Sequence, residues 1–179
     1  MSNTSAMGGY LLPVGAALPA DTALEDALQA HVVGITGLPG ALVRPRWQPV
    51  VPKMPEPCET WAAIGHSTTA VDDSPVLDQG DGSARYIRHE TIEVLVSFYG
   101  PQAEQKIKQL RDGLHLRQNN LPLLAIGAKV IWCNAIKSAP EQHNMQWVKR
   151  YDMTYALHRR VERVYPVSHI NIQPDVELG

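Results

Sequence analysis

The chain has 179 residues, 44% of them hydrophobic, which is enough for one domain with a substantial core. Its formal net charge of −2 argues against a protein that binds nucleic acid through overall positive charge. The two cysteines, Cys58 and Cys133, are too few for a disulfide framework, and their spacing matches no zinc-binding pattern.

No targeting or membrane segment is evident. The first thirty residues lack a basic region followed by an apolar run, as a signal peptide requires. No run approaches the ~20 apolar residues of a membrane span. We therefore expect a soluble, intracellular protein in which both thiols are reduced and buried.

The first third of the chain predicts an arm, a helix and a short strand. Residues 1–20 contain adjacent glycines and small residues, and we expect an irregular N-terminal arm. A helix is expected from Asp21, with one stripe formed by Leu24, Ala27, Leu28, His31, Val32 and Ile35. Leu42–Trp47 can form a strand, but Pro45 places it at a sheet edge. The proline-rich stretch 49–57 predicts a rigid connection.

A second strand is expected from Cys58 to Thr68, because its residues alternate between two faces. The next stretch, 72–83, carries four aspartates and two glycines. Its spacing does not match a calcium-binding EF-hand loop, so we expect a solvated hairpin loop there.

The clearest local pattern is a strand, a corner and a helix. A long strand is expected over 84–99, and its first half is polar enough to project past the core. Gly100-Pro101 ends it, because proline suits the first turn of a helix. The strand buries Ile92, Val94, Val96 and Phe98, and the helix from Gln102 buries Ala103, Ile107, Leu110 and Leu114. Glu104 and Lys108 are spaced for an ion pair worth ~0.3 kcal/mol.

The last third predicts a short helix and two strands. The helix begins near Asn119 or Asn120, with Leu121, Leu124 and Ile126 as apolar contacts. One strand covers 128–138, and a longer one covers 145–164. The longer strand has a period of two, with a core face of Met145, Trp147, Tyr151, Met153, Tyr155, Leu157 and Val161. It exceeds an ordinary strand and should extend beyond the domain or contain a bulge.

The element order predicts the fold class. Strands that follow one another directly favour an antiparallel pairing. We therefore expect an α+β fold with a mostly antiparallel sheet and helices packed on one side. The domain would cover 21–166, between an N-terminal arm at 1–20 and a C-terminal arm at 167–179.

No segment carries a catalytic signature. The seven histidines show no metal-binding spacing, and the glycine-rich GITGLPG lacks the lysine of a phosphate-binding loop. His89 and Glu93 share one strand face, and Glu90 faces away from them. We therefore assign no catalytic, cofactor-binding or metal-binding residue and expect no enzyme, although catalytic groups need not be close in sequence.

Basic and aromatic residues alternate along the last strand. Such a stripe can contact nucleic acid, form a subunit interface, or remain an ordinary solvated face. The overall acidity disfavours the first of these readings. Our candidate interface residues are Arg150, His158, Arg160, Arg163 and Tyr165.

Three segments carry a family resemblance, which covers Ile35 to Val167. They read ITGLPGALVRPRWQP, RHETIEVLVSFYGPQAEQKIKQLRDGL and RYDMTYALHRRVERVYPV. The most specific pieces are the SFYGP corner, the following LRDGL, and the ending from Arg160 to Pro166. In these segments the chain resembles the neck and tail terminator proteins that join head and tail in tailed phages.

The resemblance implies a structural virion protein without catalytic residues or cofactors. Such a subunit would form a ring, expected to be hexameric, at the head-proximal end of the tail. Its partners would be the tail tube protein and the head connector or stopper protein, with DNA only passing through the lumen and no membrane involved. The protein would be assembled in the host cytoplasm and reside in the virion neck.

Two alternatives remain open at this point. One is another connector or stopper protein of the head–tail junction. The other is a small-molecule-binding or catalytic α+β domain, which would show a concave pocket with convergent polar groups.

Overall fold

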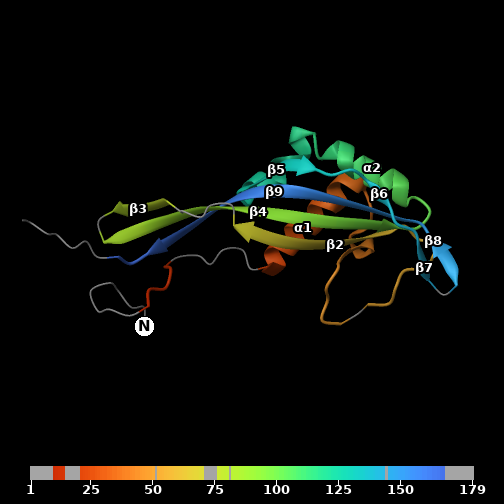
Figure 1. Cartoon of the computed structure of the whole chain (residues 1–179), viewed down its shortest axis with the longest axis horizontal. Coiled ribbons are helices and arrows are strands. Elements are labelled where there is room, and N and C mark those ends of the chain that lie inside the picture. Colours follow the sequence, from red (N-terminus) through yellow and green to blue (C-terminus); the bar gives the residue numbers. More distant parts are fainter. Residues whose placement is uncertain are drawn as a thin grey trace, which may run out of the picture.

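The computed structural model describes residues 10–14, 21–50, 52–70, 76–80, 82–143 and 145–167. Within them, a seven-stranded, mostly antiparallel sheet has the order β1-β2-β4-β9-β5, with β3 beside β4 and β6 beside β9 (Figure 1). The helices are α1 (Asp21–Thr36), α2 (Ala103–Gly113) and α3 (Leu121–Ala125), with 3-10 turns at Gly40–Leu42 and Arg117–Asn120. The strands are β1 (Val43–Pro45), β2 (Trp61–Ala70), β3 (Val76–Gly80), β4 (Ser83–Tyr99), β5 (Ala128–Cys133), β6 (Lys137–Ser138), β7 (Glu141–His143), β8 (Gln146–Val148) and β9 (Arg150–Tyr165).

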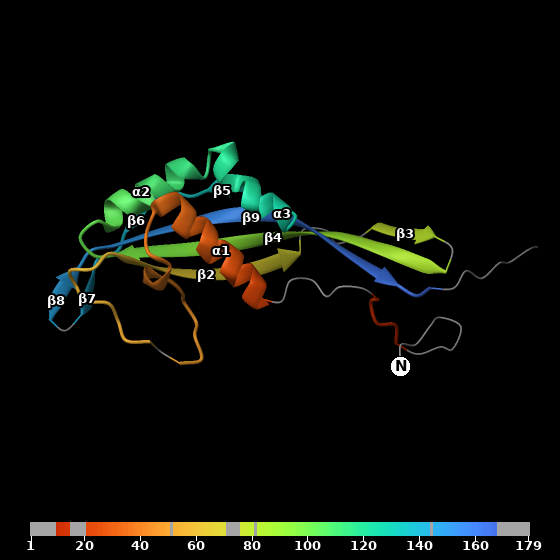
Figure 2. The ribbon, with the colours of Figure 1, turned by 180° about the vertical axis from the view of Figure 1, so that it is seen from behind.

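All three α-helices contribute to one core on one face of the sheet (Figure 2). Leu28 of α1, Ile107 of α2 and Leu123 of α3 are buried in the same cluster. The sheet supplies the alternating residues that the sequence predicted, among them Ile92, Val94, Val96, Phe98, Met153, Tyr155 and Leu157. The α+β fold with helices on one side is confirmed.

The corner after β4 depends on a glycine. Gly100 has φ +94°, a conformation that other residues rarely adopt. Its N–H donates to the carbonyl of Lys149 at 3.0 Å, and its carbonyl accepts from the N–H of Ala103 at 3.2 Å. These bonds fix the angle at which α2 leaves the sheet, so the Ala103–Leu110 stripe turns inward.

The second face of the sheet is covered only at one end. Trp61 and Tyr99 stack there with ring centroids 4.2 Å apart. Trp47 lies over Gly65, where an added Cβ would come within 2.7 Å of the indole ring. The Arg46 guanidinium donates to the hydroxyl of Ser97. The segment after β1 therefore shields this end of the face.

The far ends of β4 and β9 continue past the helices as an extension (Figures 1 and 2). There β3 pairs with β4 from Val76↔Ile87 to Gly80↔Ser83, and β4 pairs with β9 up to Ala84↔Tyr165. We call β3, residues 83–88 and residues 161–165 the ribbon. The predicted projection of β4 beyond the core is confirmed.

The predicted loop at 72–83 is wrong in part, because residues 76–80 form β3. The surrounding stretch is rich in aspartate and glycine, and residues 76–80 become a strand by pairing with the extended half of β4. Residues 71–75 and 81 lie outside the described part of the chain.

The predicted strand over 145–164 is also corrected, because it divides at Lys149 into β8 and β9. In β9 the odd-numbered residues from Met153 to Val161 are buried, as expected. Met145 and Trp147 are 90% and 73% exposed. Their hairpin, β7–β8, forms a separate two-stranded sheet, in which Val148, not Trp147, packs against Trp61 and Tyr99.

Smaller predictions also change. Cys58 is exposed in a turn before β2, and Cys133 is only half-buried. Leu121 and Leu124 are 50% and 49% exposed because the five-residue α3 buries Leu123 instead. Pro45 does lie in an edge strand, β1. Most of the predicted arms, residues 1–9, 15–20 and 168–179, lies outside the described residues, so the domain limits stay a prediction.

Candidate subunit interface

The five candidate interface residues lie along β9 in separate places. His158 and Arg160 pair with Thr91 and His89, and all four belong to the helix-free face of the sheet. Arg163 and Tyr165, three and five positions after Arg160, project from the other face. Arg150 lies at the opposite end of the strand. The structure thus places His158 and Arg160 on one face beside the ribbon, Arg163 and Tyr165 on the opposite face, and Arg150 far from all four.

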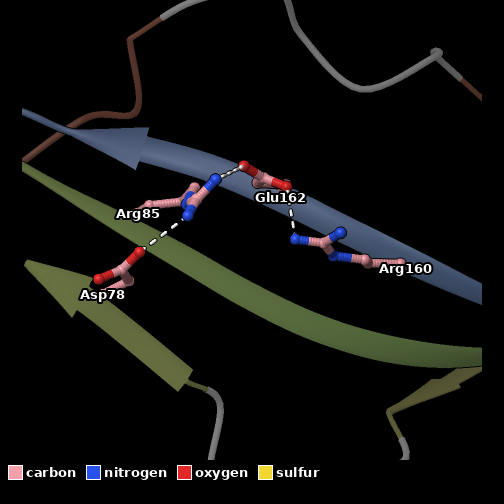
Figure 3. Close-up of polar contacts among 4 residues, drawn as sticks. All are labelled: Asp78, Arg85, Arg160 and Glu162. Atoms are coloured by element: carbon pink, nitrogen blue, oxygen red, sulfur yellow. Dashed lines mark hydrogen bonds and ion pairs between the residues drawn. The ribbon is translucent and has the colours of Figure 1, made fainter.

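A chain of ion pairs crosses the three strands of the ribbon (Figure 3). Arg85 of β4 donates to Asp78 of β3 at 2.8 Å and to Glu162 of β9 at 3.3 Å. Glu162 also pairs with Arg160 at 3.0 Å. The hydrogen bond to Asp78, and then the charge of Glu162, raise the pKa of Arg85. Because these groups are exposed, they set strand register more than they add stability.

The ribbon also exposes apolar side chains. Val76 is 61% exposed, Leu77 50% and Val164 36%. The rings of Tyr86 and Tyr165 meet edge to face, 6.2 Å apart. Val76 and Val164 lie on one face of the ribbon and Leu77, Tyr86 and Tyr165 on the other, so both faces carry exposed apolar groups of the kind that a second protein can cover.

Arg163 and His158 differ in the contacts that they make within the subunit. Arg163 is exposed and has no ion-pair partner among the described residues. His158 lies against His89, with ring centroids 5.1 Å apart, and its buried Nε2 has no hydrogen-bond partner in the described structure. Arg163 is therefore an exposed guanidinium of the ribbon that is available to contact a second molecule.

Arg150 is held within the subunit. It donates to Glu141 and Asp152, both at 2.9 Å, and its guanidinium lies 5.5 Å from the ring centroid of Tyr99. The hydrogen bond to Asp152 is the main cause that raises the pKa of Arg150. This cluster anchors the β7–β8 hairpin, whose Trp147 is exposed. We call the hairpin and Arg150 the hairpin end of the molecule.

Sequence reasoning missed the exposed apolar residues of the ribbon and of the hairpin end. Leu77 lies in a stretch that looked like a polar loop, and Trp147 lies in one that looked like a core strand. The signal for a hairpin was the position of Val76 and Leu77 just before Gly80 and Gly82.

Glu90, one of the residues that we weighed for catalysis, forms an ion pair within the subunit. Glu90 accepts from Arg159 at 2.8 Å, and both side chains are largely buried. In the described part of the chain, no group of three or more His, Cys, Asp and Glu side chains is arranged to hold a metal ion. No helix among the described residues is long and apolar enough to cross a membrane.

Comparison with known families gives one match. The model of a family described as phage neck terminator protein matches residues 22–178, which is most of the chain. The match begins at the start of α1 and continues eleven residues past Val167, where the described part ends. A search of curated proteins found no match.

Proposed function

Because the chain belongs to the phage neck terminator protein family and is thus a structural protein of the phage neck, we propose that it forms a ring that caps the tail. The ring is hexameric and sits on the head-proximal end of the tail tube. It stops tube growth and presents a surface to the head connector. DNA passes through its lumen.

The observation that carries this proposal is the pair of different exposed surfaces at the two ends of the subunit. The ribbon offers Val76, Leu77 and Arg163, and the hairpin end offers Met145 and Trp147. Two unlike surfaces suit a head-to-tail contact between copies, and such a contact makes a ring when its rotation closes.

The candidate interface residues take their places in this scheme. Arg163 and Tyr165 belong to the ribbon surface of one subunit, and His158 and Arg160 lie beside the ribbon on the helix-free face. Arg150 supports the hairpin end, which we propose as the second surface. Its internal ion pairs mean that it acts by holding the hairpin in position.

The charge balance supports the proposed lumen. A net charge of −2 over the chain leaves no excess of positive charge to retain a DNA backbone. A subunit that lines a channel for DNA transit benefits from this, because tight phosphate contacts would slow passage.

Tail tube assembly in vitro tests the capping role. Purified tail tube protein is polymerised with and without this protein, and tube lengths and ends are measured by electron microscopy. We expect a ring on one end of each tube and an arrest of growth at that end. Unchanged tubes without bound rings contradict the proposal, and binding to the head connector alone would favour the alternative of a stopper protein.

A further inference from the structure

A groove lies along β5, at the edge of the sheet. Its cavity has a volume of about 540 Å³. Five consecutive residues of β5, 129–133, form one wall, and the stretch from Leu114 to Leu124 supplies the other. β5 pairs with β9 on one side, and its other side has no strand partner in the described structure. An edge of this kind is where an extended segment can add to a sheet.

The chemistry of the groove is apolar and positive. Leu124 is 49% exposed, Ile131 45% and Trp132 38%. Arg117 and Lys129 also line the cavity, and neither has an ion-pair partner among the described residues. No carboxylate belongs to the lining. A suitable occupant is therefore an extended chain that alternates apolar and acidic side chains.

Residues 175–178 of the sequence have this pattern, because Asp175 and Glu177 alternate with Val176 and Leu178. Ahead of them, Ile170 and Ile172 alternate with neutral polar residues as far as Pro174. The family match extends to residue 178, so this segment belongs to the family pattern and is not an unrelated addition.

We propose that residues 168–179 of a neighbouring subunit bind in the groove and extend the sheet at β5. Val176 and Leu178 contact the apolar wall, and Asp175 and Glu177 pair with Arg117 and Lys129. This inference rests on the proposed ring, since the segment then links adjacent subunits.

Chain length prevents the subunit's own segment from lying along the whole groove. His158 pairs with Lys129 at the near end of the groove and Tyr155 with Cys133 at its far end, and Val167 lies nine and twelve residues further along. Those separations are about 30 and about 40 Å at ~3.4 Å per residue. Twelve fully extended residues span about 40 Å, so the subunit's own segment can reach Lys129 with its last few residues but cannot place Val176 beside Cys133.

A disulfide between two differently tagged chains tests the contact, with Cys133 as the reporter inside the groove. One chain keeps Cys133 and carries Cys58→Ser. The other carries Val176→Cys together with Cys58→Ser and Cys133→Ala. The two chains are co-expressed, oxidised in air, and analysed on a non-reducing gel. We expect a covalent dimer between the two tags, and its loss when Arg117→Glu and Lys129→Glu are added to the first chain.

The matched control retains the exposed Cys58 and carries Cys133→Ala in the first chain. Equal crosslinking to Cys58 overturns the proposal, because it shows random encounters. Rings that form by light scattering but show no crosslink to Cys133 also overturn it, and they leave the ring itself standing. A protein that stays monomeric with and without tail tubes overturns both.

Discussion

At the scale of single residues, the backbone at Gly100 constrains the fold most sharply. A Cβ at this position would collide with the carbonyl oxygen of Glu59 and lie 2.9 Å from its carbonyl carbon. The positive φ adds strain for any other residue. Gly100→Ala should therefore lower the free energy of unfolding by about 2 kcal/mol or more, measured by urea denaturation.

Gly34 is the matched control for this substitution. It lies in α1, and an added Cβ would meet nothing within 4 Å. Gly34→Ala should raise the free energy of unfolding by about 0.5–1 kcal/mol, because alanine favours a helix over glycine. Equal effects at the two positions would show that the Gly100 corner is not a constraint.

His31 should make stability depend on pH. Burial lowers its pKa below the ordinary value, and its Nε2 is 3.2 Å from the Asn120 Oδ1. The unfolded chain therefore binds a proton more readily than the folded one between the lowered pKa and ~6.5. Stability should fall as pH drops through this window.

The check is urea unfolding at about pH 7.5 and about pH 5.5, with His31→Gln as the comparison. The wild-type protein should lose more stability between the two values than the variant does. An identical loss in both proteins would assign the pH dependence to other groups.

Two substitutions at Tyr155 separate the contribution of its ring to stability from that of its hydroxyl. The side chain is fully buried, burial raises its pKa, and its hydroxyl has no hydrogen-bond partner in the described structure. Tyr155→Phe should leave stability unchanged or raise it by up to about 1 kcal/mol. Tyr155→Ser should cost about 3–5 kcal/mol by leaving a cavity. Thermal unfolding of both variants measures these two effects. A large loss of stability in Tyr155→Phe would show that the hydroxyl has a hydrogen-bond partner.

At the scale of elements, periodicity predicted the centre of the sheet and the face of α2 because those residues pack within the subunit. It failed for Trp147, which is exposed because the β7–β8 hairpin packs against the subunit through Val148 instead. It also failed for residues 76–80. They form a strand by pairing with the extended half of β4, which their own short sequence does not indicate. The charges of β9 indicated the candidate interface, which stays a prediction, while periodicity did not indicate the exposed apolar residues near it.

The ribbon is the element whose exposed surface we expect to matter for assembly. Substituting Val76→Asp and Leu77→Asp together should leave the subunit folded, because both side chains are exposed in the described structure. The double variant should lose association between copies, measured by light scattering. Circular dichroism establishes that the sheet is intact.

Val50→Asp is the control for this pair, since Val50 is 79% exposed and lies outside the ribbon. It should associate as the wild-type protein does. Unimpaired association of the ribbon variant would remove the ribbon from the interface.

At the scale of the whole molecule, the subunit has a main core beneath its helices and unlike surfaces at its two ends. Arg163 is exposed in the ribbon and lies outside the intramolecular ion pairs. Arg163→Glu should therefore reduce assembly without reducing stability. Lys53→Glu, at a side chain 88% exposed far from the ribbon in sequence, should affect neither. Virion yield and the unfolding midpoint measure the two effects separately.

The mass of the purified protein in solution tests the ring most directly. Native mass spectrometry and light scattering at several concentrations, with and without tail tubes, measure it. We predict a single closed species of six copies, formed by the protein alone or on addition of tubes. A chain that remains a monomer in every condition would contradict the ring, and with it the proposed capping of the tail.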